Sequence, residues 1–183
     1  MNYIDRLIKL LETLDFQSLE EIVLTLKETR SNGNTIFVAG NGGSSALASH
    51  FATDVGVGGL KLGQPTRVFS LNENMASLTA TANDISYDQV FAKQIEFLGK
   101  AGDALICISS SGNSQNLIEA CQVASNKSIR TIGILGFDGG KLRDTVDNLI
   151  VVKSILGDYG PVEDCHSAIC HLIAERLRSK NFE

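Results

Sequence analysis

Three histidines occur among the 183 residues, and their distances from nearby carboxylates suggest shared chemistry. His50 precedes Asp54 by four positions, a spacing that places both side chains on one face of a helix. Glu163 precedes His171 by eight positions, a little over two helical turns, so this pair can also share a face. His166 lies about 60° from Glu163 in the opposite sense, and we expect it to flank that face.

Two imidazoles and two carboxylates, brought together by two helices, suit two kinds of chemistry. Nitrogen and oxygen ligands of this kind bind zinc in a tetrahedral arrangement. The same groups can act as general acids and bases near neutral pH. Taken singly, each residue has an ordinary structural explanation, such as a packed histidine or a first-turn carboxylate that complements a helix N-terminus. The sequence therefore predicts a site that does acid–base work, and it leaves metal binding open.

Two short loops rich in glycine, serine and asparagine have the composition of an anion site. One runs from Gly40 to Ser44 and the other from Ser109 to Ser114. Each follows a predicted buried strand and leads into a predicted helix, so it offers free N–H groups at the positive end of a helix dipole. Either loop alone could be a plain tight turn. Neither carries a dinucleotide or P-loop motif, so the pair predicts a site for a single phosphate.

The elements that must position these residues alternate along the chain. Five short apolar runs are predicted strands, at 35–39, 66–71, 104–108, 131–135 and 148–152. Helical patterns follow them, at 44–55, 75–81, 87–98, 113–126 and 162–179. Continuous apolar strands separated by helices indicate a parallel sheet that is covered on both faces. The predicted class is α/β, a five-stranded flavodoxin-like domain that binds ligands at the carboxyl ends of its strands.

The first 31 residues are predicted to form two helices in addition to this sheet. Ser18 and Glu21 have the spacing of a capping box at the start of the second helix. The apolar stripes of the two helices need a partner, which could be each other or another subunit. We expect one domain over residues 1–183, with residues 1–31 as a helical extension that packs in an oligomer.

Composition limits the classes of function. The formal net charge of -5 and the lack of clustered basic residues argue against nucleic acid as a ligand. No segment has the roughly 20 apolar residues that a membrane span needs, and the start of the chain has no signal-peptide pattern. We therefore expect a cytoplasmic protein without a membrane partner. In that compartment the four cysteines are expected to stay reduced: Cys107, Cys121, Cys165 and Cys170.

These motifs together resemble a known family. GNGGS at 40–44 and SSSGNSQN at 109–116 are similar to the SIS, or sugar-isomerase, domain. The resemblance is closer to the phosphoheptose isomerases and covers essentially the whole chain. It includes GNGGSSALASHFATD, the pair Asn83–Asp84, and the last helix with its two histidines.

The resemblance implies a homotetramer with its active sites between subunits, acting on a sugar phosphate. The implied reaction converts sedoheptulose 7-phosphate to D-glycero-D-manno-heptose 7-phosphate, for lipopolysaccharide or capsule synthesis. It implies Asp54 and His171 as catalytic residues. Zinc is implied in several members through positions matching His50, Asp54, Glu163 and His171. The implied phosphate ligands are Ser109, Ser110, Ser111 and Ser114, and the implied sugar-site residues are Asn41, Gly42, Gly43, Asn83, Asp84 and Glu163.

The chain departs from the family pattern at three positions. Asp54 replaces a usual glutamate, Glu163 replaces a frequent glutamine, and Gly160 stands where relatives often have aspartate. An isomerase of a different sugar phosphate is therefore one alternative. Another is a non-enzymatic SIS protein of the kind that regulates replication initiation, and a third is a phosphosugar-sensing domain. Retention of both His50 and His171 favours the enzyme.

Overall fold

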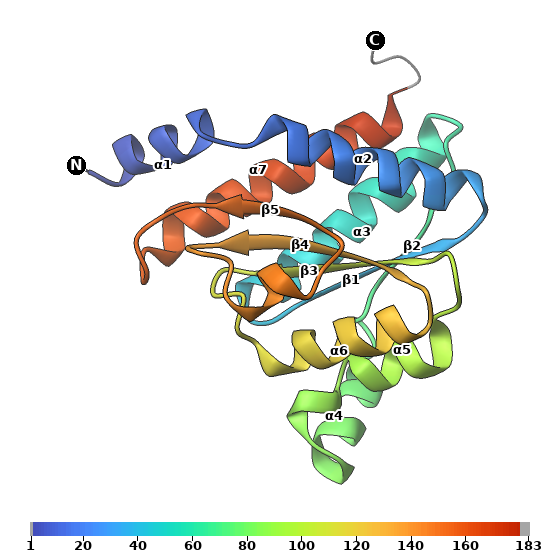
Figure 1. The fold of residues 1–183 in the computed structure, drawn as a ribbon. Coiled ribbons are helices and arrows are strands. Elements are labelled where there is room, and N and C mark those ends of the chain that lie inside the picture. The colour runs from blue at the N-terminus through green and yellow to red at the C-terminus, as the bar shows by residue number, and fades with distance from the viewer. Residues whose placement is uncertain (1, 180–183) are drawn as a thin grey trace.

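A five-stranded parallel sheet forms the centre of the protein (Figure 1). The computed structural model describes residues 2–179, so both ends of the predicted 1–183 domain lie outside the described part. The strand order is β2–β1–β3–β4–β5, which is the flavodoxin-like order that the sequence predicts. The strands are β1 (Thr35–Gly40), β2 (Arg67–Ser70), β3 (Ala104–Ser109), β4 (Arg130–Gly136) and β5 (Asn148–Val152).

Helices cover both faces of the sheet (Figure 1). One face carries α2 (Phe16–Ser31), α3 (Gly43–Lys61) and α7 (Tyr159–Arg178), with α1 (Tyr3–Glu12) lying against α7. The other face carries α5 (Ala92–Leu98) and α6 (Gln115–Asn126), and α4 (Met75–Asp84) projects beyond them. Two single 3₁₀ turns lie at Tyr87–Gln89 and Lys141–Asp144. Among the described helices, none is both long and apolar enough to cross a membrane.

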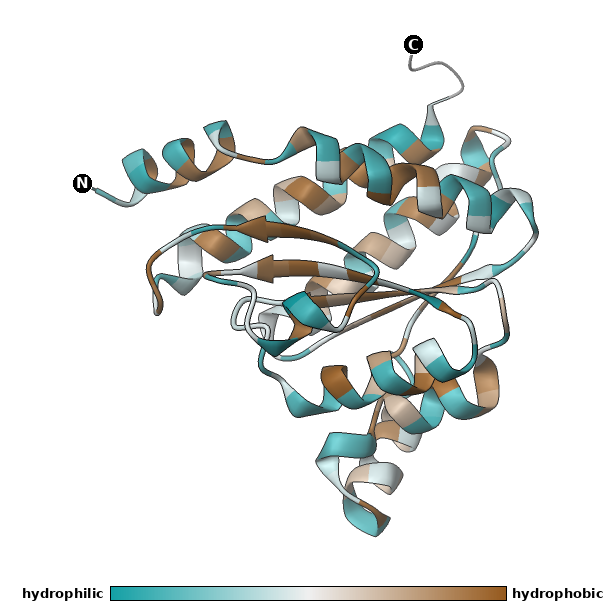
Figure 2. Ribbon diagram, viewed as in Figure 1, coloured by the Kyte–Doolittle hydropathy of each residue, from teal (hydrophilic) through white to brown (hydrophobic). Residues whose placement is uncertain are grey.

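Two apolar layers hold the helices to the sheet, one on each face. Ile36 and Val38 of β1 belong to the layer under α2, α3 and α7. Phe37 and Ala39 belong to the layer over α5 and α6. Side chains alternate between the faces of a strand, so a strand buried on both sides is apolar throughout. Figure 2 shows this as apolar strands lying between helices whose polar sides face outward.

The start of α2 differs from the prediction. Asp15 is the N-cap residue, and its carboxylate accepts hydrogen bonds from the backbone N–H groups of Gln17 and Ser18. The predicted capping box that begins at Ser18 is therefore wrong, because Asp15 starts the helix three residues earlier. The apolar stripe of α2 packs on its own domain, whereas α1 has no fully buried side chain along its described length. α2 therefore packs on β1, β5 and α7 of its own chain, whereas the prediction named only the two helices themselves or another subunit as partners.

Three helices are longer than predicted, and α4 reaches Asp84 rather than ending at 81. The helix predicted over 87–98 is instead a 3₁₀ turn at Tyr87–Gln89 followed by α5. α3 continues to Lys61 through Gly56, Gly58 and Gly59, which appear in sequence as a helix stop. An added Cβ at Gly56 would lie 3.2 Å from Val68, so the absence of a side chain lets β2 pack close to the helix. α7 begins at Tyr159, ahead of the predicted start at 162.

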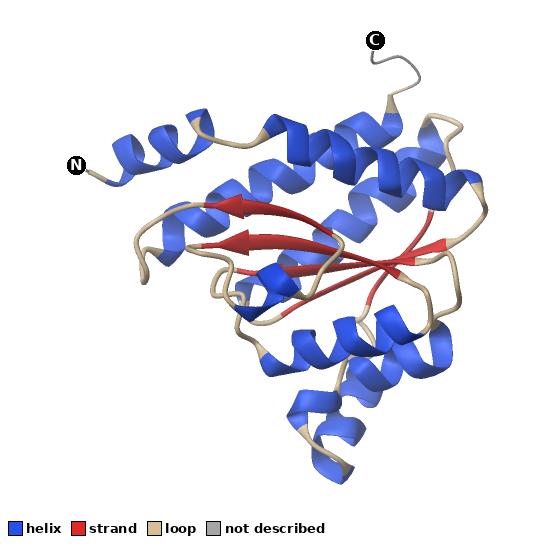
Figure 3. Cartoon of the chain, viewed as in Figure 1, coloured by secondary structure: helices blue, strands red, loops and turns tan. Residues whose placement is uncertain are grey.

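The carboxyl ends of the strands meet at one edge, and the loops after β1 and β3 lie there (Figure 3). At the opposite edge, the buried carboxylate of Asp103 accepts hydrogen bonds from the N–H of Thr35 at 2.8 Å and of Lys100 at 2.9 Å. Asp103 thus ties the start of β1 to the turn before β3.

Asp103→Ala should destabilise the fold without altering the site at the other edge. Removing the acceptor leaves buried N–H groups unpaired, which costs about 1–3 kcal/mol. We expect the free energy of unfolding, measured by urea titration, to fall by that amount, while Glu28→Ala on the exposed face of α2 leaves it unchanged. Equal stability of the two variants would show that Asp103 does not anchor β1.

Candidate active site

The packing of α3 against α7 brings His50, Asp54 and His171 together. The two Nε2 atoms of the histidines lie 3.0 Å apart. Asp54 Oδ2 lies 3.4 Å from His50 Nε2 and 3.7 Å from His171 Nε2. The imidazole rings meet edge to face, with their centroids 5.2 Å apart. The predicted convergence of the two helix faces is therefore present within a single chain.

The cluster is open on its outer side. His50 and His171 have side chains that are 52% and 54% exposed, and Asp54 is 25% exposed. Below them, Phe51 and Cys170 are buried in the layer between the helices and the sheet. The helices are thus fixed by an apolar contact, while the polar groups at its rim are open to the surroundings.

The spacing of the three donor atoms suits a tetrahedral metal. Their ligand atoms all lie within 4.8 Å of one another. Zinc bonds to imidazole and carboxylate of about 2.0–2.2 Å imply ligand separations of roughly 3.3–3.5 Å along a tetrahedron edge. The distances above bracket that value, and three protein ligands would leave one position for a substrate. Asp54, although one methylene shorter than the usual glutamate, reaches both imidazoles.

Glu163, the fourth predicted ligand, is not in this group. It lies on α7 about 12 Å from His171 along the helix axis. Its Oε2 atom is 3.5 Å from the position that a Cβ at Gly43 would occupy. Glu163 therefore faces the start of α3, where the backbone of Gly42 and Gly43 turns from β1 into the helix.

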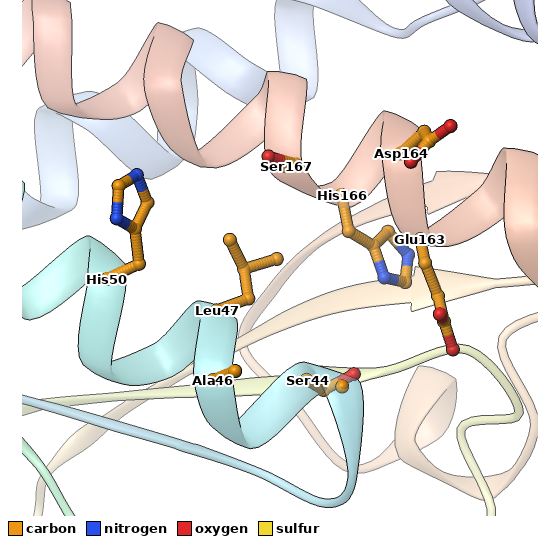
Figure 4. A pocket seen from close by; sticks show the side chains of 9 residues that line it. Ser44, Ala46, Leu47, His50, Glu163, Asp164, His166 and Ser167 are labelled. Carbon is orange, nitrogen blue, oxygen red and sulfur yellow. The ribbon is translucent and has the colours of Figure 1, made fainter.

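A pocket of ≈ 320 Å³ joins the two ends of this region (Figure 4). His50 lines one end of it, and Gly43 and Glu163 line the other. Its volume is at the low end of the range for small-molecule sites, about 300–1,000 Å³. The remaining lining residues are Ser44, Ala46, Leu47, Asp164, His166 and Ser167.

The environment of His166 could not be foreseen from the sequence. Its side chain is fully buried, and neither ring nitrogen has a hydrogen-bonding partner among the described residues. Burial lowers the pKa of His166 to about 4. The backbone carbonyl of Leu135 lies near enough to the ring to oppose this shift in part, but it makes no well-formed hydrogen bond with either nitrogen. The imidazole is therefore uncharged at neutral pH.

The serine loop lies at the N-terminus of α6, with Ser109 and Ser110 buried and Ser111 and Ser114 half-buried. Ser109 Oγ accepts a hydrogen bond from Gly112 N at 3.1 Å, and Ser111 Oγ accepts one from Asn113 N at 3.2 Å. Ser110 Oγ is buried and has no partner in the described part of the chain. No described side chain caps α6, whose N-cap residue is Ser114. The loop thus keeps backbone and hydroxyl donors available for an anion.

A side-chain network ties the two loops to each other. Asn41 and Asn116 exchange two amide hydrogen bonds, each 2.9 Å long. The hydroxyl of Tyr87 donates to Asn41 Oδ1 at 2.8 Å. Asn41, predicted to line the sugar site, thus also connects the β1–α3 turn to α6. The place of Asn116 in SSSGNSQN could have suggested a role at the site, but nothing in the sequence suggests that Tyr87 belongs to this network.

Asn83 and Asp84 are not brought to the histidine cluster. They are exposed at the end of α4 and are joined by a 2.8 Å hydrogen bond between their own side chains. α4 lies on the α5 and α6 side of the sheet, whereas α3 and α7 cover the other face (Figure 1). Within one chain, these two residues therefore stand apart from the histidine cluster, although α4 lines a second pocket together with Asn41 and Gly42.

Gly160 stands where relatives often have aspartate, and the structure gives a local reason for a glycine there. An added Cβ at Gly160 would lie 3.0 Å from the Tyr3 ring, so a larger residue there would displace α1. The Tyr3 hydroxyl donates to Asp164 Oδ2 at 2.6 Å, and this hydrogen bond raises the pKa of Tyr3 to about 12. Tyr3 thus fills the space beside Asp164 at the rim of the pocket.

Comparisons with known proteins agree with this arrangement. The family model described as "SIS domain" matches residues 1–136. The phosphoheptose isomerase of Helicobacter pylori is 38% identical over 87% of this chain and 82% of its own length. That of Aliarcobacter butzleri is 41% identical over 91% of this chain and 87% of its own.

A solved structure matches over nearly the same extent. The phosphoheptose isomerase of Neisseria gonorrhoeae superposes with a TM-score of 0.86 and 31% identity, covering 94% of this chain and 91% of that one. The chain therefore belongs to the SIS-domain family and, within it, to the phosphoheptose isomerases.

Proposed function

We propose that this protein interconverts a ketose phosphate and an aldose phosphate, with sedoheptulose 7-phosphate as the preferred ketose. The observation that carries the proposal is the cluster of His50, Asp54 and His171, beside a pocket that leads toward the start of α3. Its relatives from Helicobacter pylori and Aliarcobacter butzleri carry the name of this activity. The substrate is a sugar phosphate whose phosphate end and reacting end bind at different places.

The serine loop binds the phosphate. Backbone N–H groups at the start of α6 and the hydroxyls of Ser109, Ser110, Ser111 and Ser114 supply the donors. A site built from neutral donors fits a chain whose net charge is -5. Anchoring the phosphate fixes the distance to the reacting carbons, so they are held in a productive position. Asn41, Gly42, Gly43 and Glu163 contact the sugar chain between these two ends.

Asp54 and His171 move the protons. The isomerisation removes a proton from the carbon beside the carbonyl and adds one to the neighbouring carbon through an enediol. Asp54 is the base, because its carboxylate is partly buried and lies within 3.4–3.7 Å of the Nε2 atoms of both imidazoles. His171 exchanges the proton of the substrate oxygen, since a neutral imidazole both donates and accepts.

His50, Asp54 and His171 would hold a zinc ion. When bound, zinc would polarise the substrate carbonyl and so favour loss of the neighbouring proton. Glu163 would complete the set only after a change of side-chain rotamer, since it now faces Gly43. Asn83 and Asp84 serve the sugar site of a neighbouring subunit in a cytoplasmic homotetramer. Exposed apolar residues on α1, such as Ile4 and Ile8, support packing of the 1–31 helices in that oligomer.

Ser111→Ala should weaken binding of the phosphate without slowing the chemistry. Losing one hydrogen bond to a charged group costs about 1.5–3 kcal/mol, so we expect KM to rise tenfold or more while kcat changes little. Steady-state kinetics of aldose formation measures both, with Ser125→Ala at the exposed end of α6 as the control. The phosphate assignment fails if KM is the same in the two variants.

His171→Ala should mainly lower turnover and should also reduce zinc binding. General acid–base catalysis contributes about 10²–10⁴-fold, so we expect kcat to fall by at least 100-fold. Glu175→Ala, an exposed carboxylate one turn later on α7, is the matched control. Zinc content after dialysis is measured beside activity, and equal activity of the His171 variant and the wild type would remove this residue from the mechanism.

The function itself is tested with a panel of ketose phosphates that differ in chain length, with added zinc and with a chelator. We expect aldose formation from sedoheptulose 7-phosphate, loss of activity with the chelator and recovery with zinc. Activity confined to a shorter ketose phosphate would reassign the substrate. An inert protein that instead captures a replication-initiation protein would favour the non-enzymatic alternative.

A further inference from the structure

The imidazole of His166 is buried in the wall of the pocket, and neither of its nitrogens makes a well-formed hydrogen bond among the described residues. It lies on the α7 wall, and Figure 4 shows its ring directed from α7 toward the start of α3, beside Glu163. Its side chain is 0% exposed. Buried polar atoms in folded proteins almost always have a hydrogen-bonding partner, so two unpaired ring nitrogens in one residue call for an explanation.

The state of the ring limits what it can bind. An uncharged imidazole has one N–H donor and one acceptor nitrogen. A phosphate or carboxylate would satisfy only the donor, and an ammonium group only the acceptor. A hydroxyl group both donates and accepts, so a chain of hydroxyl-bearing carbons can satisfy both nitrogens at once. The chemistry of the ring therefore selects a polyhydroxylated ligand.

The position of His166 agrees with such a ligand. His50 lines the pocket at its outer end, and Ser44 and Glu163 line it near the start of α3. His166 is between these ends in the lining, five residues before His171 on the same helix. A ligand that reaches from the histidine cluster toward the sheet edge passes this point with the middle of its carbon chain.

We propose that His166 forms a binding subsite for the hydroxyl groups in the middle of an acyclic sugar phosphate. This subsite rests on the proposed function, because it assumes a ligand whose phosphate end and carbonyl end are held elsewhere. Glu163 is exposed and lies one helical turn before His166, so the ligand reaches the ring when the Glu163 side chain turns aside. Ser44 and Ser167 add hydroxyl groups to the same pocket.

The test uses binding rather than turnover, so it separates this subsite from the catalytic assignment. Two probes are titrated calorimetrically, sorbitol 6-phosphate as an acyclic polyol phosphate and inorganic phosphate as the anion alone. The variants are His166→Phe, which removes both nitrogens, and His166→Gln, which restores a donor and an acceptor. Ile169→Val, a buried apolar change one turn later, is the control for altered packing.

We expect His166→Phe to raise Kd for sorbitol 6-phosphate about three- to tenfold, as for one neutral hydrogen bond, and to leave Kd for phosphate unchanged. His166→Gln should recover part of the loss. Because the wild-type ring is unpaired without ligand, we also expect Tm of His166→Phe to be unchanged or higher by about 2–4 °C. Ser111→Ala, by contrast, should weaken both probes.

The proposal is overturned if wild type binds the two probes equally, or if His166→Phe and Ile169→Val bind sorbitol 6-phosphate alike. It is also overturned if His166→Phe unfolds or loses several degrees of Tm while His166→Gln binds no better, since His166 would then be a structural residue. Absence of isomerase activity, with the polyol preference intact, would overturn the catalytic proposal and leave the subsite standing.

Discussion

The contact between α3 and α7 is the constraint on which the site depends. The two histidines are 121 residues apart in the chain, yet their helices cover the same face of the sheet, α3 after β1 and α7 after β5. Their buried sides include small residues such as Ala48 and Ala174, which let the helices approach closely. Only this approach brings two imidazoles to 3.0 Å and places a carboxylate beside them.

The other half of the site depends on where parallel strands end. The turns after β1 and β3 lie side by side because these strands are neighbours in the sheet. The Asn41–Asn116 amide pair then fixes one turn against the other. The proposed anion site needs no cationic side chain, since N–H groups and hydroxyls would supply the donors. The proposed catalytic and phosphate-binding ends are thus positioned by the same sheet but by different faces and loops.

Sequence pattern was sufficient for the fold because the strands are buried on both faces. Their apolar runs, and the glycine and serine turns that follow, gave the strand positions to within a residue or two. The pairing of His50 with Asp54 followed from helical spacing alone. Its pairing with His171 could only be hypothesised, because it depends on which helices share a face of the sheet. The resemblance to phosphoheptose isomerases strengthened that hypothesis.

What the sequence could not supply is the direction of individual side chains. Glu163 shares a helix with His171, but its carboxylate turns toward Gly43, since the rotamer is set by neighbours that spacing does not reveal. The lack of a well-formed hydrogen bond to His166 within the described part of the chain is likewise a property of packing. The start of α2 shows the same limit on a local scale. Asp15 and Ser18 are both suitable N-cap residues, and the sequence did not show that the helix begins at Asp15.

The central claim is that Asp54, held beside two histidines, removes the proton next to the substrate carbonyl. The most direct measurement follows deuterium from D₂O into that carbon of sedoheptulose 7-phosphate by proton NMR, for wild type and Asp54→Asn. The account predicts exchange in the wild type and a rate at least 100-fold lower in the variant, in line with the loss of a general base. Equal exchange rates in the two proteins would contradict it.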